Sequence, residues 1–160
     1  MPIFFTLLAA ATLAVATPTA VLPPILPNAG AQPAWRALRA DTVADLVLAT
    51  ETLNGRVRFV AHGLKGSVPV TTADFTPDSV RTWAASATEL ASAASPKMGE
   101  MRGLGQALTL NVTTATTGEP TFGFYVGDAV SDQQLALALT KANVVKLTAG
   151  VNSALDAMGH

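Results

Sequence analysis

The side chains best suited to chemistry are one histidine and two carboxylates that lie far apart along the chain. His62 is the only histidine in the interior of the sequence, since His160 is the last residue. Paired with Asp74 or Asp128, it could act as the general base of a hydrolase, provided that loops bring the two groups within hydrogen-bond reach. This alternative predicts a cleft that holds His62 and one of the two carboxylates.

Other kinds of reactive site are not indicated. The chain has no cysteine, which excludes thiol nucleophiles, disulfides and thiolate metal ligands. No nucleophile elbow, phosphate-binding loop, zinc-protease helix or calcium loop occurs in the sequence. One histidine among scattered carboxylates is a weak pattern for metal binding, so the sequence predicts neither a metal nor another cofactor.

The charge of the chain argues against nucleic acid as a partner. The 160 residues include 10 basic and 11 acidic side chains, which gives a formal net charge of −1. Only 13% of the residues are charged, against about 25% in a typical soluble domain. A protein that follows a phosphate backbone usually carries a basic stripe, and none is present.

The N-terminal segment has the properties of a secretory leader. An apolar run from Ile3 to Ala16 has the length of a signal-peptide core, and small residues follow it. Cleavage patterns end at Ala16 and at Ala31, and cleavage at the second would also remove a proline-rich stretch. We therefore expect a leader over residues 1–31 and a periplasmic or secreted domain over residues 32–160. An uncleaved leader would instead tether the domain to a membrane, although prolines interrupt its apolar run.

The first half of the domain shows clear signals for a hairpin. Asn54-Gly55 favours a type I′ turn, because both central residues of that turn have positive φ. A two-residue loop sets Leu53 opposite Arg56 and Glu51 opposite Arg58. The preceding segment, Trp35–Thr42, is interpreted as a lead-in with one helical turn.

A third strand and a helix are expected to follow the hairpin. Pro69 places the third strand at a sheet edge, because proline cannot donate to a ladder. Thr76 and Pro77 form a good helix start, and apolar residues at helical spacing follow them. Ser95–Gln106 is interpreted as a flexible connection to the second half.

The second half repeats this order of elements. Two alternating runs are predicted to pair through a loop at residues 117–119, with Val112 opposite Phe124. A third run and a final helix that begins at Thr140 complete the pattern. The sequence therefore predicts an α+β fold made of a duplicated βββα unit, with repeats over about residues 43–95 and 106–158. Both helices are expected on one face of an antiparallel sheet, and a half-closed β-barrel with two helices is the alternative.

The uncovered side of this sheet is the candidate binding surface. The first half places Arg56, Arg58 and His62 on it, with Lys65 in the adjoining loop, and the second half adds Tyr125. The leading hypothesis is a non-enzymatic module that binds a protein or a small ligand through this face or through a sheet edge. Self-association at an edge is its simplest form, because an edge strand presents unpaired backbone groups.

Overall fold

The computed structural model describes residues 33–114 and 119–159. The chain divides into two units, and the second, Trp35–His160, holds every helix and strand described below. This unit has its own hydrophobic core and is therefore expected to fold by itself. The predicted leader over residues 1–31 lies outside the described residues.

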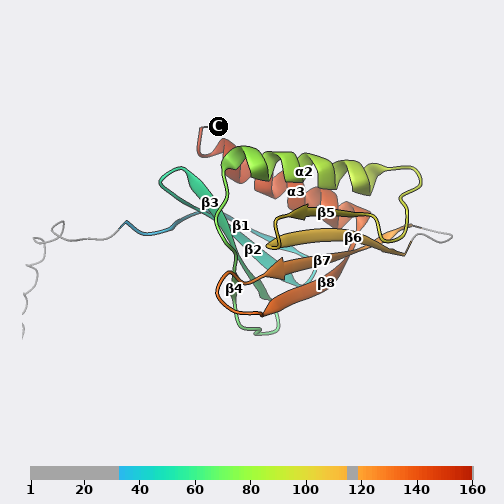
Figure 1. The fold of residues 1–160 in the computed structure, drawn as a ribbon, viewed down its shortest axis with the longest axis horizontal. Helices are drawn as coiled ribbons and strands as arrows, with labels where there is room; N and C mark the ends of the chain where they lie inside the picture. Colours follow the sequence, from blue (N-terminus) through green and yellow to red (C-terminus); the bar gives the residue numbers. More distant parts are fainter. Residues whose placement is uncertain (1–32, 115–118, 160) are drawn as a thin grey trace, which may run out of the picture. The chain divides into compact units, whose positions relative to one another are not determined.

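The unit has an α+β architecture, as the sequence predicts. Its strands form two antiparallel four-stranded sheets, in the orders β1-β2-β3-β4 and β5-β6-β7-β8, and neither sheet is closed into a barrel (Figure 1). The sequence predicts one antiparallel sheet, or a half-closed β-barrel as the alternative. The structure instead has two separate open sheets. Along the chain, four strands and one helix follow one another twice: β1 (Arg36–Val43), β2 (Leu46–Leu53), β3 (Arg56–Gly63), β4 (Val70–Thr71), α2 (Pro77–Ser92), β5 (Met101–Leu104), β6 (Leu108–Thr114), β7 (Thr121–Gly127), β8 (Gln134–Thr140) and α3 (Lys141–Asp156).

Each half has one strand more than the sequence interpretation assigns to it. The expected lead-in with a helical turn is strand β1, and the expected flexible connection contains strand β5. β1 buries only its last residue, Val43, so it lacks the alternation that marks a half-buried strand. β5 has only four residues and includes Gly103, which gives little strand signal. The repeated unit is therefore ββββα.

The hairpin of β2 and β3 has the predicted register. Leu53 pairs with Arg56 and Glu51 pairs with Arg58. Asn54 and Gly55 have φ values of 51° and 77°, as a turn with two left-handed residues requires. One face of both strands is consequently buried along its whole length, while the other face remains partly exposed.

The register predicted for β6 and β7 is wrong by two residues. Val112 pairs with Phe122, and Phe124 pairs with Leu110. An irregularity between Val112 and Thr114 shifts the ladder, and the connection between the strands is longer than three residues. The same side chains still face the core, because a shift of two residues preserves the inward face of a strand.

Both helices begin at the predicted threonine. The hydroxyl groups of Thr76 and Thr140 each accept a hydrogen bond from a backbone N–H three residues later, at 3.2 Å. These N-caps satisfy donors that the first helical turn leaves free. Each helix then buries the apolar stripe that faces the sheets.

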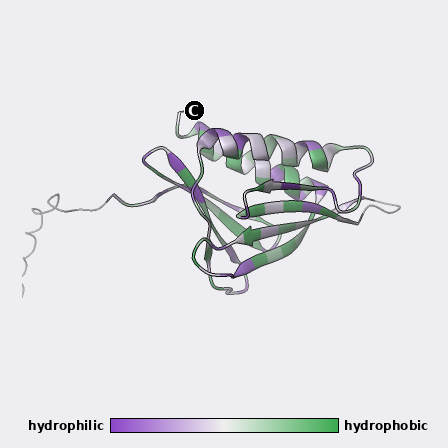
Figure 2. Ribbon diagram, in the orientation of Figure 1, coloured by the Kyte–Doolittle hydropathy of each residue, from purple (hydrophilic) through white to green (hydrophobic). Residues whose placement is uncertain are grey.

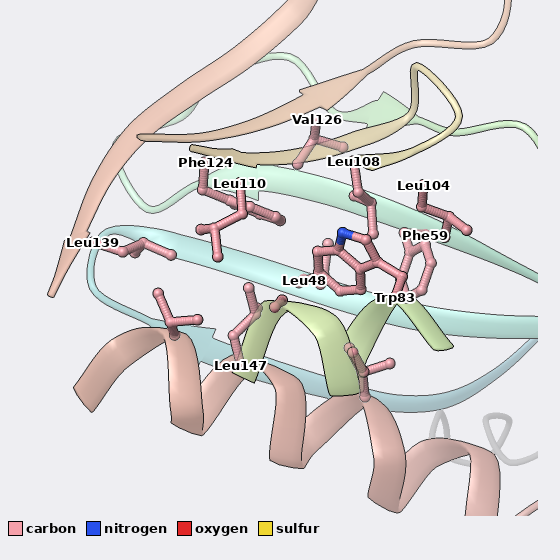
Figure 3. Packing of buried hydrophobic residues seen from close by; sticks show 14 of the residues in the cluster. Leu48, Phe59, Trp83, Leu104, Leu108, Leu110, Phe124, Val126, Leu139 and Leu147 are labelled. Atoms are coloured by element: carbon pink, nitrogen blue, oxygen red, sulfur yellow. The ribbon is translucent and has the colours of Figure 1, made fainter. Parts of the chain in front are cut away.

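The helices pack against each other, and each lies beside a strand of the other half. α2 contacts β5, and α3 contacts β1. The inner faces of both sheets and the two helices enclose one core, in which Leu48 and Phe59 of the first sheet lie near Trp83 of α2 (Figure 3). Because both inner faces line this core, the outer faces of the two sheets point away from each other.

Candidate functional site

The structure does not bring His62 together with either candidate carboxylate. His62 lies near the end of β3, opposite Val47. Asp74 is engaged at the start of the same strand, where its Oδ2 accepts a hydrogen bond from Arg56 Nε at 2.7 Å. Arg56 and His62 are six residues apart on one strand, which corresponds to about 20 Å. No hydrogen bond joins His62 to Asp74 or Asp128 in the part of the chain that the structure describes.

Asp128 organises the loop between β7 and β8 and links it to the other sheet. Its Oδ1 accepts hydrogen bonds from the N–H groups of Val130 and Ser131, at 2.8 and 2.9 Å, and its Oδ2 accepts one from Thr71 N–H at 3.1 Å. The hydrogen bond from Val130, together with those from Thr71 and Ser131, lowers the pKa of Asp128 below the usual aspartate value. These contacts give the carboxylate a structural role.

Replacing Asp128 with alanine is expected to lower the thermal stability of the unit, because three backbone donors lose their acceptor. The folded-state pKa is depressed, so the contribution of the carboxylate is complete above the ordinary aspartate pKa of about 4 and is lost as the pH falls through the folded-state value. The difference in Tm between wild type and Asp128→Ala should therefore be constant near neutral pH and shrink in acid. Asp132→Ala, at an exposed position of the same loop, is the control. A difference that persists unchanged in acid would contradict this assignment.

The cations on the outer face of the first sheet are largely neutralised. Arg58 Nε donates to Glu51 Oε2 at 2.8 Å, and its guanidinium carbon lies 4.3 Å from the centroid of the Trp35 ring. Arg56 is held by Asp74, as described above. Lys65 is exposed in the loop after β3. Two of the three predicted cationic binding residues are thus already paired within the domain, which weakens the case for an anion site on this face.

Tyr125 belongs to the other sheet and does not extend this surface. It lies on β7 between Thr109 of β6 and Ala136 of β8. Around it the outer face is filled by side chains, since a Cβ atom added at Gly123 would lie 2.5 Å from Asn111 Oδ1 and 3.0 Å from the Tyr125 ring. The expected common binding surface is therefore divided between two sheets.

Three of the four sheet edges carry features that oppose strand pairing. β1 has charged residues, an irregularity between Ala37 and Arg39, and α3 beside it. β4 has two residues, follows Pro69 and is occupied by the loop after β7, because Ala129 N–H donates to Thr71 O at 2.8 Å. β5 is short and lies beside α2. Short length, charge, proline, bulges and coverage are the usual protections of an edge strand.

Strand β8 is neither short nor charged and has no proline or bulge, although it contacts α3 and β3. Its seven residues, QLALALT, include no charged residue and no proline, and its pairing with β7 shows no irregularity. It is the last strand of its sheet, and no described residue donates or accepts a backbone hydrogen bond on its free side. Figure 2 shows most of this strand in the green of apolar residues. We take the free edge of β8 as the candidate functional site.

An apolar groove lies next to this edge. It has a volume of about 380 Å³ and is lined by Leu135, Ala136 and Leu137 of β8, by Asp45 and Leu46 at the start of β2, and by the loop Gly63–Ser67. The side chain of Leu64 in this loop is 53% exposed. A strand added to β8 would direct alternate side chains toward this groove, as strand-binding domains do with their pockets.

Comparisons of the chain with protein-family models, with curated proteins and with solved structures each found no match. None of the helices within residues 33–114 and 119–159 has the length and hydropathy needed to cross a membrane. The same residues contain no cluster of three or more histidine, aspartate or glutamate side chains suited to a metal ion. The candidate site therefore rests on the geometry of this chain alone.

Proposed function

We propose that this protein is an exported, non-enzymatic interaction module that binds an extended segment of a partner protein by strand addition at β8. The observation that carries the proposal is that β8 is a long, uncharged edge strand with regular pairing, whereas the other three edges are short, charged, irregular or occupied. In this binding mode, backbone hydrogen bonds supply affinity and side-chain pockets supply specificity. Arg56 and Arg58 are already paired with carboxylates of the same domain. The edge of β8 is therefore a better candidate binding site than the outer face of the first sheet.

Export is the part of the proposal that depends on the N-terminal apolar segment. Its simplest check is the intact mass of the protein recovered outside the cytoplasm. A mass that lacks residues 1–31 would support a cleaved leader, and a mass that includes them would favour the membrane-tethered alternative.

Strand addition can be tested with peptides. A display library of random nine-residue peptides, panned against the immobilised unit Trp35–His160, should return sequences with alternating apolar residues. These peptides should bind in fluorescence anisotropy titrations, and Leu135→Lys should weaken the binding at least about tenfold. A charge that points inward from an edge strand opposes strand pairing, and here it would enter the groove.

Val130→Lys is the matched control. It makes the same kind of change at a residue that is 94% exposed in the loop before β8 and does not line the groove, so peptide binding should change little. Thermal unfolding of each variant separates a binding defect from a folding defect. Failure to recover any binding peptide, or equal binding by wild type and folded Leu135→Lys, would refute strand addition at β8.

A further inference from the structure

We infer that the strand added at β8 is the β8 strand of a second copy of this chain, in antiparallel orientation and centred on Leu137. This inference rests on the proposed function, because it names the occupant of the same edge. The resulting contact would use one surface twice, as expected for a dimer with a twofold axis. It would join two four-stranded sheets into one continuous sheet.

The sequence of β8 is symmetric about Leu137. From Leu135 to Leu139 it reads LALAL, which is the same in both directions. Antiparallel pairing centred on Leu137 therefore sets each leucine opposite a leucine and each alanine opposite an alanine. All three leucines would lie on the inner side of the joined sheet, where Leu139 is already buried and the other two are half-buried. The partly exposed leucines would thus gain apolar neighbours from the second copy.

The charges that flank β8 favour the same orientation. Asp132 precedes the strand, and Lys141 follows it directly. Both residues are exposed. In the antiparallel register, Asp132 of one copy lies beside Lys141 of the other at each end of the contact. A parallel arrangement would bring like charges together, which is unfavourable.

The alanines of β8 allow the register to be tested directly. Ala136 and Ala138 are exposed on the outer side of the strand, so charged substitutions there should not disturb the core. In the proposed register, Ala136 of one copy faces Ala138 of the other. The variant A136K/A138K would therefore oppose lysine to lysine at both positions, whereas A136K/A138E would oppose lysine to glutamate.

Sedimentation equilibrium over a wide concentration range measures the outcome. The unit Trp35–His160 should pass from monomer to dimer as its concentration rises. A136K/A138K should stay monomeric, A136K/A138E should dimerise again, and circular dichroism should show all three to be folded. Only a contact at the free edge of β8, in the register centred on Leu137, gives this set of results.

Each other outcome overturns the inference in an identifiable way. A wild-type unit that stays monomeric, yet binds library peptides in a manner sensitive to Leu135→Lys, would refute the second copy while preserving strand addition. A dimer that both double variants leave intact would place the contact elsewhere on the molecule. A dimer that both double variants abolish would refute the register centred on Leu137.

Discussion

Replacing Phe124 with alanine should destabilise the domain by about 3–5 kcal/mol, which is the usual cost of deleting a buried phenylalanine ring. Phe124 is fully buried, pairs with Leu110 and Leu137, and has its ring centroid 6.3 Å from that of Trp83. Its loss would open a cavity where the second sheet meets α2. Since a domain is typically stable by only about 5–15 kcal/mol, Tm should fall by roughly 10–20 °C.

Tyr125→Ala is the matched control for this substitution. Tyr125 is the next residue of β7, but its side chain lies on the outer face of the sheet and is partly exposed. Removing it should cost less than half as much, because little buried area is lost. Equal losses for Phe124→Ala and Tyr125→Ala in denaturant titrations would contradict the assignment of the inner face of β7.

Trp83→Ala should have an effect of similar size, about 3–5 kcal/mol. Trp83 is 3% exposed and projects from α2 toward the second sheet, where its Nε1 donates to Arg102 O at 3.3 Å. The substitution would remove the largest side chain that joins the helix of the first half to a strand of the second. It therefore tests whether α2 of the first half packs against the sheet of the second half.

Two further variants separate the contributions of Trp83. Thr82→Ala, at the adjacent exposed position of α2, should be nearly neutral. The double variant Trp83→Ala/Phe124→Ala should lose less stability than the sum of the single variants, by about 0.5–1.5 kcal/mol, because the two rings interact. Strict additivity, or a Trp83→Ala variant as stable as Thr82→Ala, would mean that α2 does not pack against β7 in this way.

The elements that local signals define could be predicted from the sequence. Asn54-Gly55 set the turn and thus the register of β2 and β3, and Thr76 and Thr140 set the starts of both helices. In each case the information lies within a few residues of the feature, since caps and tight turns depend on local backbone geometry.

Features that depend on neighbours distant in sequence could not be predicted in this way. β1 forms although it is mostly exposed, because it pairs with β2 and packs beside α3. The division into two sheets follows from the packing of the halves, and no local pattern specifies it. Alternation of apolar and polar residues decides which face of a strand points inward, but registers that differ by two residues satisfy it equally well. The irregularity after Val112 selected one of these registers, and no local pattern predicts it.

The candidate site was missed for the same reason. The sequence suggested a sheet edge as one binding surface, but an edge is identified only when the strand order is known. The absence of charge and proline in QLALALT was a usable signal, since natural edge strands usually carry such residues. The reactive side chains were considered instead, but the structure pairs Asp74 with Arg56 and Asp128 with backbone N–H groups rather than with His62.

Amide hydrogen exchange of β8 tests the central claim most directly, because it reports whether the free edge is open and whether it becomes filled. In dilute solution, the β8 amides that point away from β7 should exchange rapidly, while the amides of β6 and β7 stay protected. On association, or with a bound library peptide, those same β8 amides should become protected. Protection of the whole strand in the dilute monomer, or rapid exchange that persists after binding, would contradict strand addition at this edge.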